Sequence, residues 1–515
     1  SLAAWAESQS CYISQRFYES MRKNGVDGIY YSNARGDHAE AAYMLAKTGL
    51  FGLPNYYYYA PKPDKARQGF PLNQNSLNDP EYLAQQSQKM LALSEIWSKY
   101  DVYCYTDGSD KKRGGNSFDE PSIAAFKLWM QNRYQSVEKL NQEMGSQYHS
   151  FAELKPLPLE MARKQNALPL WIEYNRFFEE RFLDYFKVML QLARQQDLNG
   201  KAYLGPDGFG RLDPFEFCGM YELLQTVNYF NLYTYQDPPQ MEIGRSLLQY
   251  CPNVSFRSIY AGSYGSQYMN YEFMRSIPWF MLLHGYNGFF WYMGNGKLSY
   301  SSEGCLAFMP DLRPSEGFMV AAEQIQEMRK GTANLVAVSK RRHDGIAVLY
   351  SNDSVAAATV DKQENLLRQS LSTLQQILED TGLQYDYIPP EKIEDGALQE
   401  NYRLLFLPCI LSLSENCLAG IERFVQAGGM VIADQMPGKY DGLLRKGPQE
   451  KLQDRFAAKQ EWRLFDWKNY GRLRRQAKAG KARREEILEL MQGKLTRLSS
   501  FAENGLPNVE KIEYE

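Results

Sequence analysis

The chain has 515 residues, which exceeds one ordinary domain and predicts two or three. Its 58 Lys and Arg residues nearly balance 61 Asp and Glu residues, and the net charge of −3 excludes a global attraction to nucleic acid or to an anionic membrane. No apolar run is long enough to span a bilayer, and no signal peptide is visible. Ser1 lies beside a predicted strand end, as it would after removal of a leader, so the compartment stays open among cytoplasm, periplasm and secretion.

The cysteine and histidine patterns exclude several kinds of site. No CxxC pair or metal-ligand spacing connects the seven cysteines, which predicts reduced core thiols; they are Cys11, Cys104, Cys218, Cys251, Cys305, Cys409 and Cys417. HExxH, GxSxG and Walker motifs are absent, which argues against zincin, serine-hydrolase and P-loop chemistry. We therefore expect neither a metal nor a cofactor.

Predicted strands and helices alternate through the first two thirds of the chain. Apolar and aromatic runs predict strands at 4–8, 28–32, 55–60, 101–107, 201–207, 229–235, 254–260 and 288–292. Helical spacing is found between them at 10–24, 39–47, 79–100, 171–196, 215–226, 241–249, 271–284 and 315–331. Eight buried strands that alternate with helices predict an α/β fold, a (β/α)8 TIM barrel over residues 1–335, with its chemistry at the carboxyl ends of the strands.

A second unit follows the barrel. Strands predicted at 345–350, 402–408 and 428–434 alternate with helices at 364–380 and 415–427, which indicates a smaller doubly wound α/β domain over 343–436. It lacks GxGxxG, so no nucleotide is assigned to it. Residues 437–515 are polar and basic, with a helix expected at 487–495; a solvated linker is favoured over nucleic-acid binding. Residues 509–514 alternate like the first strand of a β-rich domain.

Asp107 is the main candidate for a catalytic residue. It ends the predicted fourth strand and opens into a glycine-rich loop, as an acid at a barrel active site does. The alternative is a structural carboxylate that caps the loop or pairs with Lys111, Lys112 or Arg113.

Two further aspartates could act with Asp107. Asp207 ends the fifth strand, and Asp237 follows the sixth; the alternative for both is a turn, because Asp207 lies in Gly-Pro-Asp-Gly and Asp237 precedes two prolines. Glu272 and Glu303, on later loops, are surface residues by default.

The candidate substrate-binding residues also follow predicted strand ends. An aromatic ring at such an end suits a sugar face as well as a core, and a polar group suits a hydroxyl. Arg257 lies within a buried strand, where an ion pair with an inward acid is the structural alternative. The candidates are Trp291, Tyr260, Arg257, Tyr235 and Asn33.

The segment after the fourth strand resembles a known family. Residues 121–145 contain Phe126-Lys-Leu-Trp-Met-Gln-Asn-Arg-Tyr134 and Leu140-Asn-Gln-Glu-Met-Gly145. This is similar to the "F..W...KY.s.e.LN..wG" insertion of family 42 glycoside hydrolases, and the order of parts is similar over residues 10–436. The resemblance implies a β-glycosidase with a barrel, a trimerisation domain and the start of a β-sandwich. It also implies activity on galactosides and a homotrimer.

The resemblance fits less well at the catalytic carboxylates. The family ends its fourth strand in Asn-Glu, where this chain has Thr106-Asp107, and its seventh strand in a nucleophilic Glu, where this chain has Ile259-Tyr-Ala-Gly262. Hydrolysis needs two carboxyl groups, about 5 Å apart for retention or about 6.5–9.5 Å for inversion. The second group is then Asp207 or Asp237, or Glu272 or Glu303, or else Ala261 is an engineered replacement, or the protein is not a hydrolase.

We therefore expect a glycoside hydrolase that cleaves a β-galactoside-like or related oligo- or polysaccharide, anionic glycans included, with Asp107 as proton donor and Asp207 or Asp237 as its partner. The expected partners are the carbohydrate and further copies of the chain, with neither nucleic acid nor membrane. The alternative is a catalytically inactive barrel that binds a glycan or acts as a scaffold.

Overall fold

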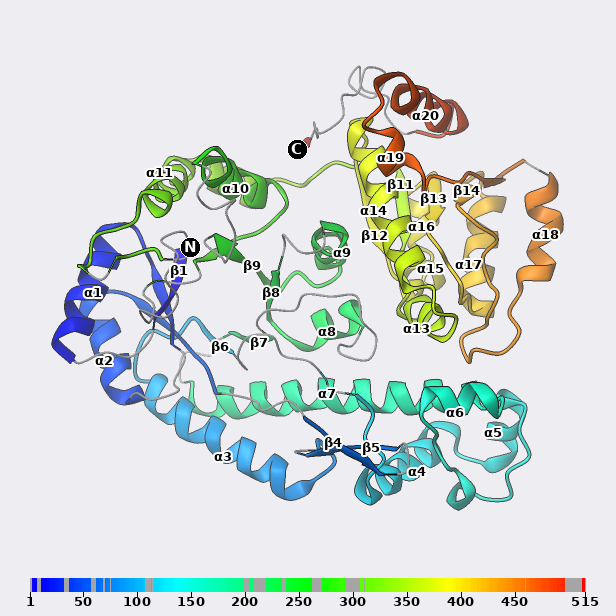
Figure 1. The fold of residues 1–515 in the computed structure, drawn as a ribbon, viewed down its shortest axis with the longest axis horizontal. Coiled ribbons are helices and arrows are strands. Elements are labelled where there is room, and N and C mark those ends of the chain that lie inside the picture. The colour runs from blue at the N-terminus through cyan, green and yellow to red at the C-terminus, as the bar shows by residue number, and fades with distance from the viewer. Residues whose placement is uncertain are drawn as a thin grey trace.

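The structure is a computed structural model with two parallel sheets as its main parts (Figure 1). It describes residues 2–6, 11–31, 37–56, 62–67, 70–74, 76–106, 113, 115–197, 203–206, 219–233, 238–261, 271–291, 294, 306–309, 311–458, 460–495 and 512–514. No helix in these ranges combines the length and the apolar character that a bilayer span requires.

Eight parallel strands form the first sheet. They are β1 (Leu2–Ala6), β2 (Gly28–Tyr31), β3 (Phe51–Pro54), β6 (Cys104–Thr106), β7 (Tyr203–Gly205), β8 (Tyr229–Tyr233), β9 (Ser255–Ala261) and β10 (Phe289–Trp291). The helices that follow them are α1 (Cys11–Lys23), α2 (His38–Thr48), α3 (Pro80–Trp97), α7 (Leu168–Gln196), α8 (Met220–Thr226), α9 (Pro238–Leu248), α10 (Tyr271–Leu283) and α11 (Glu316–Arg329). The predicted alternation of strand and helix is confirmed.

Backbone hydrogen bonds join these strands into a ring. Six strands pair in the order β3-β2-β1-β10-β9-β8, and β6 pairs with β7. Parallel bridges at Gly52–Val102 and Asn55–Thr106 join β3 to β6. The amide of Asn228 donates to the carbonyl of Leu204 at 3.3 Å, which joins β7 to β8. The eight strands therefore close a (β/α)8 barrel, as the alternation predicted.

The third strand differs from its prediction. It spans Phe51–Pro54, not 55–60, although Gly52 and Pro54 have low strand propensity. Gly52 is required by packing, because a Cβ there would lie 2.1 Å from the ring of Trp97. An unpredicted antiparallel hairpin of β4 (Lys62–Arg67) and β5 (Phe70–Gln74) follows.

The family-like segment folds as a helical insertion between β6 and α7. Its helices are α4 (Glu120–Tyr134), α5 (Val137–Met144), the 3-10 turn Phe151–Glu153 and α6 (Leu159–Lys164). A core of aromatic residues, including Phe126, Tyr174 and Phe177, packs α4 against α7. The 29-residue α7 runs from the barrel to this insertion along the lower edge of Figure 1.

The second sheet has five parallel strands in the order β12-β11-β13-β14-β15. The strands are β11 (Ile346–Leu349), β12 (Tyr385–Ile388), β13 (Leu404–Leu407), β14 (Met430–Ala433) and β15 (Trp462–Leu464). The helices around them are α13 (Asn352–Val360), α14 (Glu364–Asp380), α15 (Pro390–Glu394), α16 (Ala397–Asn401), α17 (Glu415–Gln426) and α18 (Gln449–Ala458). This is the doubly wound order of flavodoxin-like sheets. It extends past the expected boundary at residue 436.

The C-terminal part lies against both units. The helices α19 (Tyr470–Leu473) and α20 (Ala477–Leu490) follow β15, and α20 begins ten residues before the expected helix at 487–495. Arg474 pairs with buried Asp380 of α14 at 2.6 Å, which holds α19 to the sheet domain. Of the strand predicted at 509–514, the described residues show one antiparallel bridge between Tyr514 and Arg341.

Buried ion pairs connect the barrel to the α/β domain. Arg176 of α7 pairs with Asp353 of α13 at 2.9 Å, and Arg245 of α9 pairs with Asp386 of β12 at 3.0 Å. Charges this far from water are stable only when paired, so these contacts fix the position of one unit on the other.

The described cysteines are core residues. Cys104, Cys251, Cys409 and Cys417 are buried free thiols, as predicted for them.

Candidate functional site

The mouth of the barrel is lined by buried polar residues. Tyr30, Leu53, Cys104, Tyr229 and Phe290 form one cluster inside the strand ring. Side chains on a strand alternate between its two faces, so the residues two positions further along β3, β6 and β8 share this inner face nearer the carboxyl end. These residues are Asn55, Thr106 and Asn231, all 2 % exposed or less.

Hydrogen bonds hold the two amides against tyrosines of the layer below. Asn55 Nδ2 donates to the Tyr30 hydroxyl at 2.9 Å, and Asn231 Nδ2 donates to the Tyr229 hydroxyl at 3.2 Å. The Thr106 hydroxyl is buried and has no hydrogen-bond partner among the described residues. An unsatisfied buried hydroxyl costs about 1–3 kcal/mol, so a water or a ligand hydroxyl is its natural partner.

The candidate catalytic carboxylates follow strands that end at this mouth. Thr106, the last residue of β6, pairs with Gly205, the last residue of β7. Asp107 and Asp207 come one and two residues later in the sequence, and Asp237 follows β8. The structure does not describe Asp107, Asp207 or Asp237. Asn33 and Tyr235 also lie outside the described residues.

The remaining sequence candidates lie on β9 and β10. Arg257 and Tyr260 belong to β9, where Arg257 is in register with Asn231; the structure describes their backbone alone. Trp291 is 1 % exposed and its ring meets Phe318 of α11 edge-on at 5.2 Å. The contacts of Trp291 are thus those of the core-packing alternative.

Arg113, which the sequence offered as a partner of Asp107, lies in the insertion core. Its guanidinium donates to Asn175 Oδ1 at 2.8 Å and to Asn116 Oδ1 at 3.1 Å, and the side chain is 1 % exposed. These bonds attach the loop after β6 to α7. The loop that contains Asp107 is therefore anchored on the far side by a buried cation.

A second polar site is an acidic cavity of about 630 Å³ between the barrel helices and the α/β domain. It lies beyond the carboxyl ends of β11, β12 and β13, the edge where doubly wound sheets bind ligands. Two arginines and seven carboxylates line this interdomain cavity: Arg133, Arg176, Glu143, Glu179, Glu180, Glu222, Asp353, Glu391 and Glu394. No group of side chains among the described residues has metal-binding geometry.

The arginines of the interdomain cavity are already engaged by acids. Arg133 pairs with Glu173 at 2.8 Å, and Arg176 pairs with Glu173 at 2.7 Å and with Asp353 at 2.9 Å. The other carboxylates therefore face one another. Burial, and then the nearby Glu391 and Glu179, raise the pKa of Glu222 to about 8.

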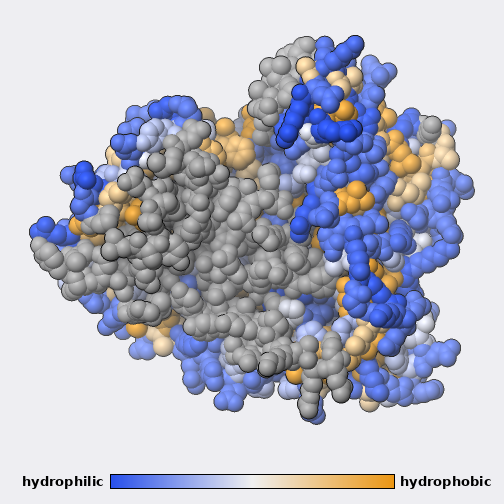
Figure 2. Space-filling view, in the orientation of Figure 1, coloured by the Kyte–Doolittle hydropathy of each residue, from blue (hydrophilic) through white to orange (hydrophobic). Residues whose placement is uncertain are grey.

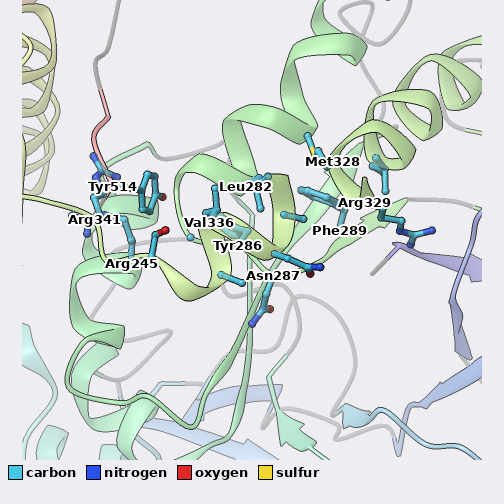
Figure 3. Close-up of a pocket in the computed structure, with 16 residues that line it drawn as sticks. Arg245, Leu282, Tyr286, Asn287, Phe289, Met328, Arg329, Val336, Arg341 and Tyr514 are labelled. Atoms are coloured by element: carbon cyan, nitrogen blue, oxygen red, sulfur yellow. The ribbon is translucent and has the colours of Figure 1, made fainter. Parts of the chain in front are cut away.

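A third cavity, of about 580 Å³, lies at the amino-terminal end of the barrel (Figure 3). Arg245, Arg341 and Tyr514 stand at one end, Phe289 and Met328 at the other, and Leu282, Tyr286 and Val336 between them. The helix α12 (Thr332–Val338), which packs on α10 and α11, forms one wall and exposes Leu335 and Val338. Figure 2 shows hydrophobic surface beside α10. Active sites of such barrels lie at the opposite end.

Sequence reasoning did not single out Asn55, Thr106 or Asn231 as functional residues. A polar residue inside an apolar strand, such as Asn231 in Tyr-Phe-Asn-Leu-Tyr, was the available indication. Which face it occupies depends on strand register, which the sequence does not contain.

The comparisons with known proteins agree with this architecture. The sequence model of the family 42 glycoside hydrolases, described as β-galactosidase, matches residues 106–256. No curated protein matches the chain.

Several solved structures have the same fold. A β-galactosidase from Halorubrum lacusprofundi superposes with a TM-score of 0.69 at 15% identity, over 88% of this chain and 76% of that one. A β-galactosidase from Rahnella sp. R3 gives 0.67 at 15% identity, over 88% and 74%. A family 42 exo-carrageenase from Bacteroides ovatus gives 0.58 at 11% identity, over 95% and 67%. The chain therefore resembles the family 42 glycoside hydrolases and has their barrel fold.

Proposed function

We propose that the protein is a glycoside hydrolase that cleaves a β-galactoside or a related oligo- or polysaccharide, anionic glycans included, by carboxyl acid/base catalysis. The observation that carries the proposal is the end of β6. Thr106 lies at the barrel mouth, paired with Asn55 on one side and Gly205 on the other, and Asp107 is the next residue of the chain. Enzymes with this fold take their catalytic groups from such strand ends.

Asp107 is proposed to protonate the leaving oxygen, with Asp207 or Asp237 as the second carboxylate. The pairing of β6 with β7 supports Asp207, because adjacent parallel strands lie about 4.8 Å apart. Two carboxylates this near would raise each other's pKa, as a proton donor at neutral pH requires.

Substitution of each aspartate tests these roles. The purified protein is assayed on a panel of 4-nitrophenyl β-glycosides and on oligosaccharides. Asp107→Asn should lower kcat/KM on oligosaccharides by about 10²–10⁴-fold, and less on 4-nitrophenyl glycosides, whose leaving group needs no proton. Asp207→Asn or Asp237→Asn should abolish activity on both, since the second carboxylate acts on the sugar carbon or on the attacking water.

The result that would count against the proposal is equally clear. Full activity in Asp107→Asn would remove this residue from catalysis. Sugar binding without any turnover by the wild type would leave a glycan-binding scaffold.

We also propose that the protein forms a homotrimer through its α/β domain, as the family resemblance implies. Light scattering coupled to size-exclusion chromatography tests this. A mass of about three chains of 59.5 kDa supports the trimer, and a single-chain mass refutes it.

A further inference from the structure

The interior of the barrel contains two tyrosine–asparagine pairs that the catalytic proposal does not use. Tyr30 with Asn55 spans β2 and the end of β3, and Tyr229 with Asn231 lies on β8. Both pairs have the same geometry, with the amide nitrogen donating to the phenol oxygen of the layer below. All four side chains are 2 % exposed or less.

These pairs are unusual for the place they occupy. The interior of a (β/α)8 barrel is ordinarily filled by branched apolar side chains. Burying an amide costs free energy unless all of its groups find partners, and a Phe–Leu pair of similar volume would avoid that cost. Polar groups kept against the local packing rule are expected mainly at functional sites.

Strand register puts Asn55 beside the proposed acid. Asn55 pairs with Thr106 across a parallel bridge, and the amide of Tyr56 donates to the Thr106 carbonyl at 3.0 Å. Adjacent strands are about 4.8 Å apart, which is about the width of one sugar ring. Asn55 therefore lies one strand over from Asp107 and one residue below it. The unpartnered hydroxyl of Thr106 lies between them.

We propose that Asn55 and Asn231 bind substrate hydroxyls at the floor of the cleft, and that Tyr30 and Tyr229 are positioning residues that hold the two amides in place. A carboxamide presents one acceptor and two donors, and a sugar hydroxyl is both donor and acceptor, so the groups are complementary. The hydrogen bond to the phenol uses one donor of each amide and restricts its rotation. The inference rests on the proposed glycosidase function.

Deoxygenated substrates separate this role from a structural one. The probe is the aryl β-glycoside that the wild type cleaves fastest, together with its 2-, 3-, 4- and 6-deoxy forms. Asn55→Ala should lower kcat/KM on the parent glycoside by about 10- to 100-fold. On the one deoxy form that lacks the bound hydroxyl, the variant and the wild type should have equal kcat/KM, because there is no contact left to lose.

Tyr30→Phe tests the positioning residue. It removes the hydroxyl and keeps the ring, which packs edge-on against Phe290 at 6.2 Å. We expect a rise in KM of about 5- to 10-fold on the parent glycoside, which disappears on the same deoxy form. Tyr470→Phe is the matched control, since it removes a buried hydroxyl bonded to Asp380 at 2.7 Å in the α/β domain. It should lower the unfolding temperature and leave KM unchanged.

The outcomes are distinguishable. Equal losses on every deoxy substrate would mean that Asn55 only maintains the fold, and would overturn the inference while the hydrolase function stands. Unchanged kcat/KM in Asn55→Ala and Asn231→Ala would overturn it as well. A wild type that cleaves no glycoside of the panel overturns the proposed function and this inference with it.

Discussion

The carboxylates of the interdomain cavity should make the protein less stable as the pH rises through neutrality. Glu222 is the residue to change, because burial, Glu391 and Glu179 raise its pKa from 4.5 to about 8. In the unfolded chain it loses its proton near pH 4.5, and in the folded protein near pH 8. Between these values the folded state holds more protons, so stability falls with increasing pH.

The structure bounds the size of this effect. The difference between 4.5 and about 8 corresponds to at most about 5 kcal/mol, since one pKa unit is about 1.4 kcal/mol. Glu222 is half-buried and borders a cavity wide enough for water, so solvent screening should leave about 2 kcal/mol. Glu222→Gln replaces the carboxyl with a neutral group of the same shape. It should match the wild type at pH 5 and exceed its stability by about 2 kcal/mol at pH 9.

Urea unfolding from pH 5 to pH 9, followed by tryptophan fluorescence, measures this difference. Glu323→Gln, at an exposed position on α11, is the control and should follow the wild-type curve throughout. A constant difference between Glu222→Gln and the wild type, or one that shrinks at high pH, would refute the reasoning. It would mean that Glu222 is charged in the folded protein at every pH tested.

Three further outcomes are expected from the packing. Arg176→Met should destabilise the protein by about 3–5 kcal/mol in urea unfolding, because it leaves the buried Glu173 carboxylate short of one partner and breaks the contact with Asp353; Arg181→Met, on the exposed side of α7, should cost far less. Trp291→Ala should cost about 3–5 kcal/mol with KM unchanged, whereas a raised KM at full stability would indicate a substrate contact. Gly205→Ala should cost about 3 kcal/mol, since its Cβ would lie 1.9 Å from the Tyr229 carbonyl oxygen; a stable variant would contradict that close approach.

The sequence predicts the architecture because the periodic elements are long and buried. The helices α3 and α7 and the apolar strand β11 were placed within a few residues. The strand β3 was misplaced because the run of tyrosines after Asn55 has higher strand propensity than Phe-Gly-Leu-Pro, and tertiary packing against Trp97 overrides that preference. The strand β15 was missed because three residues are too few for periodicity to appear.

The candidate site was harder to predict than the fold. A strand end with a carboxylate is visible in the sequence, so Asp107 and Asp207 could be proposed. The inner faces of β3 and β8 become visible only when register is known, because a shift of one residue would turn Asn55 and Asn231 toward the helices. The acidic cavity depends on contacts between α7, α8 and α15, which are far apart in the sequence.

The pairing of β1 with β10 has a consequence for synthesis of the protein on the ribosome. Leu2 and Phe289, which pair in the closed ring, are separated by roughly 290 residues of chain. At about 5–20 residues per second, β1 therefore waits about 15–60 s for its neighbour. During that time one edge of β1 offers unpaired backbone groups to other nascent chains. Chaperone demand should thus depend on the distance between these two strands, and a circular permutant that begins at β10 should fold during synthesis with less aggregation.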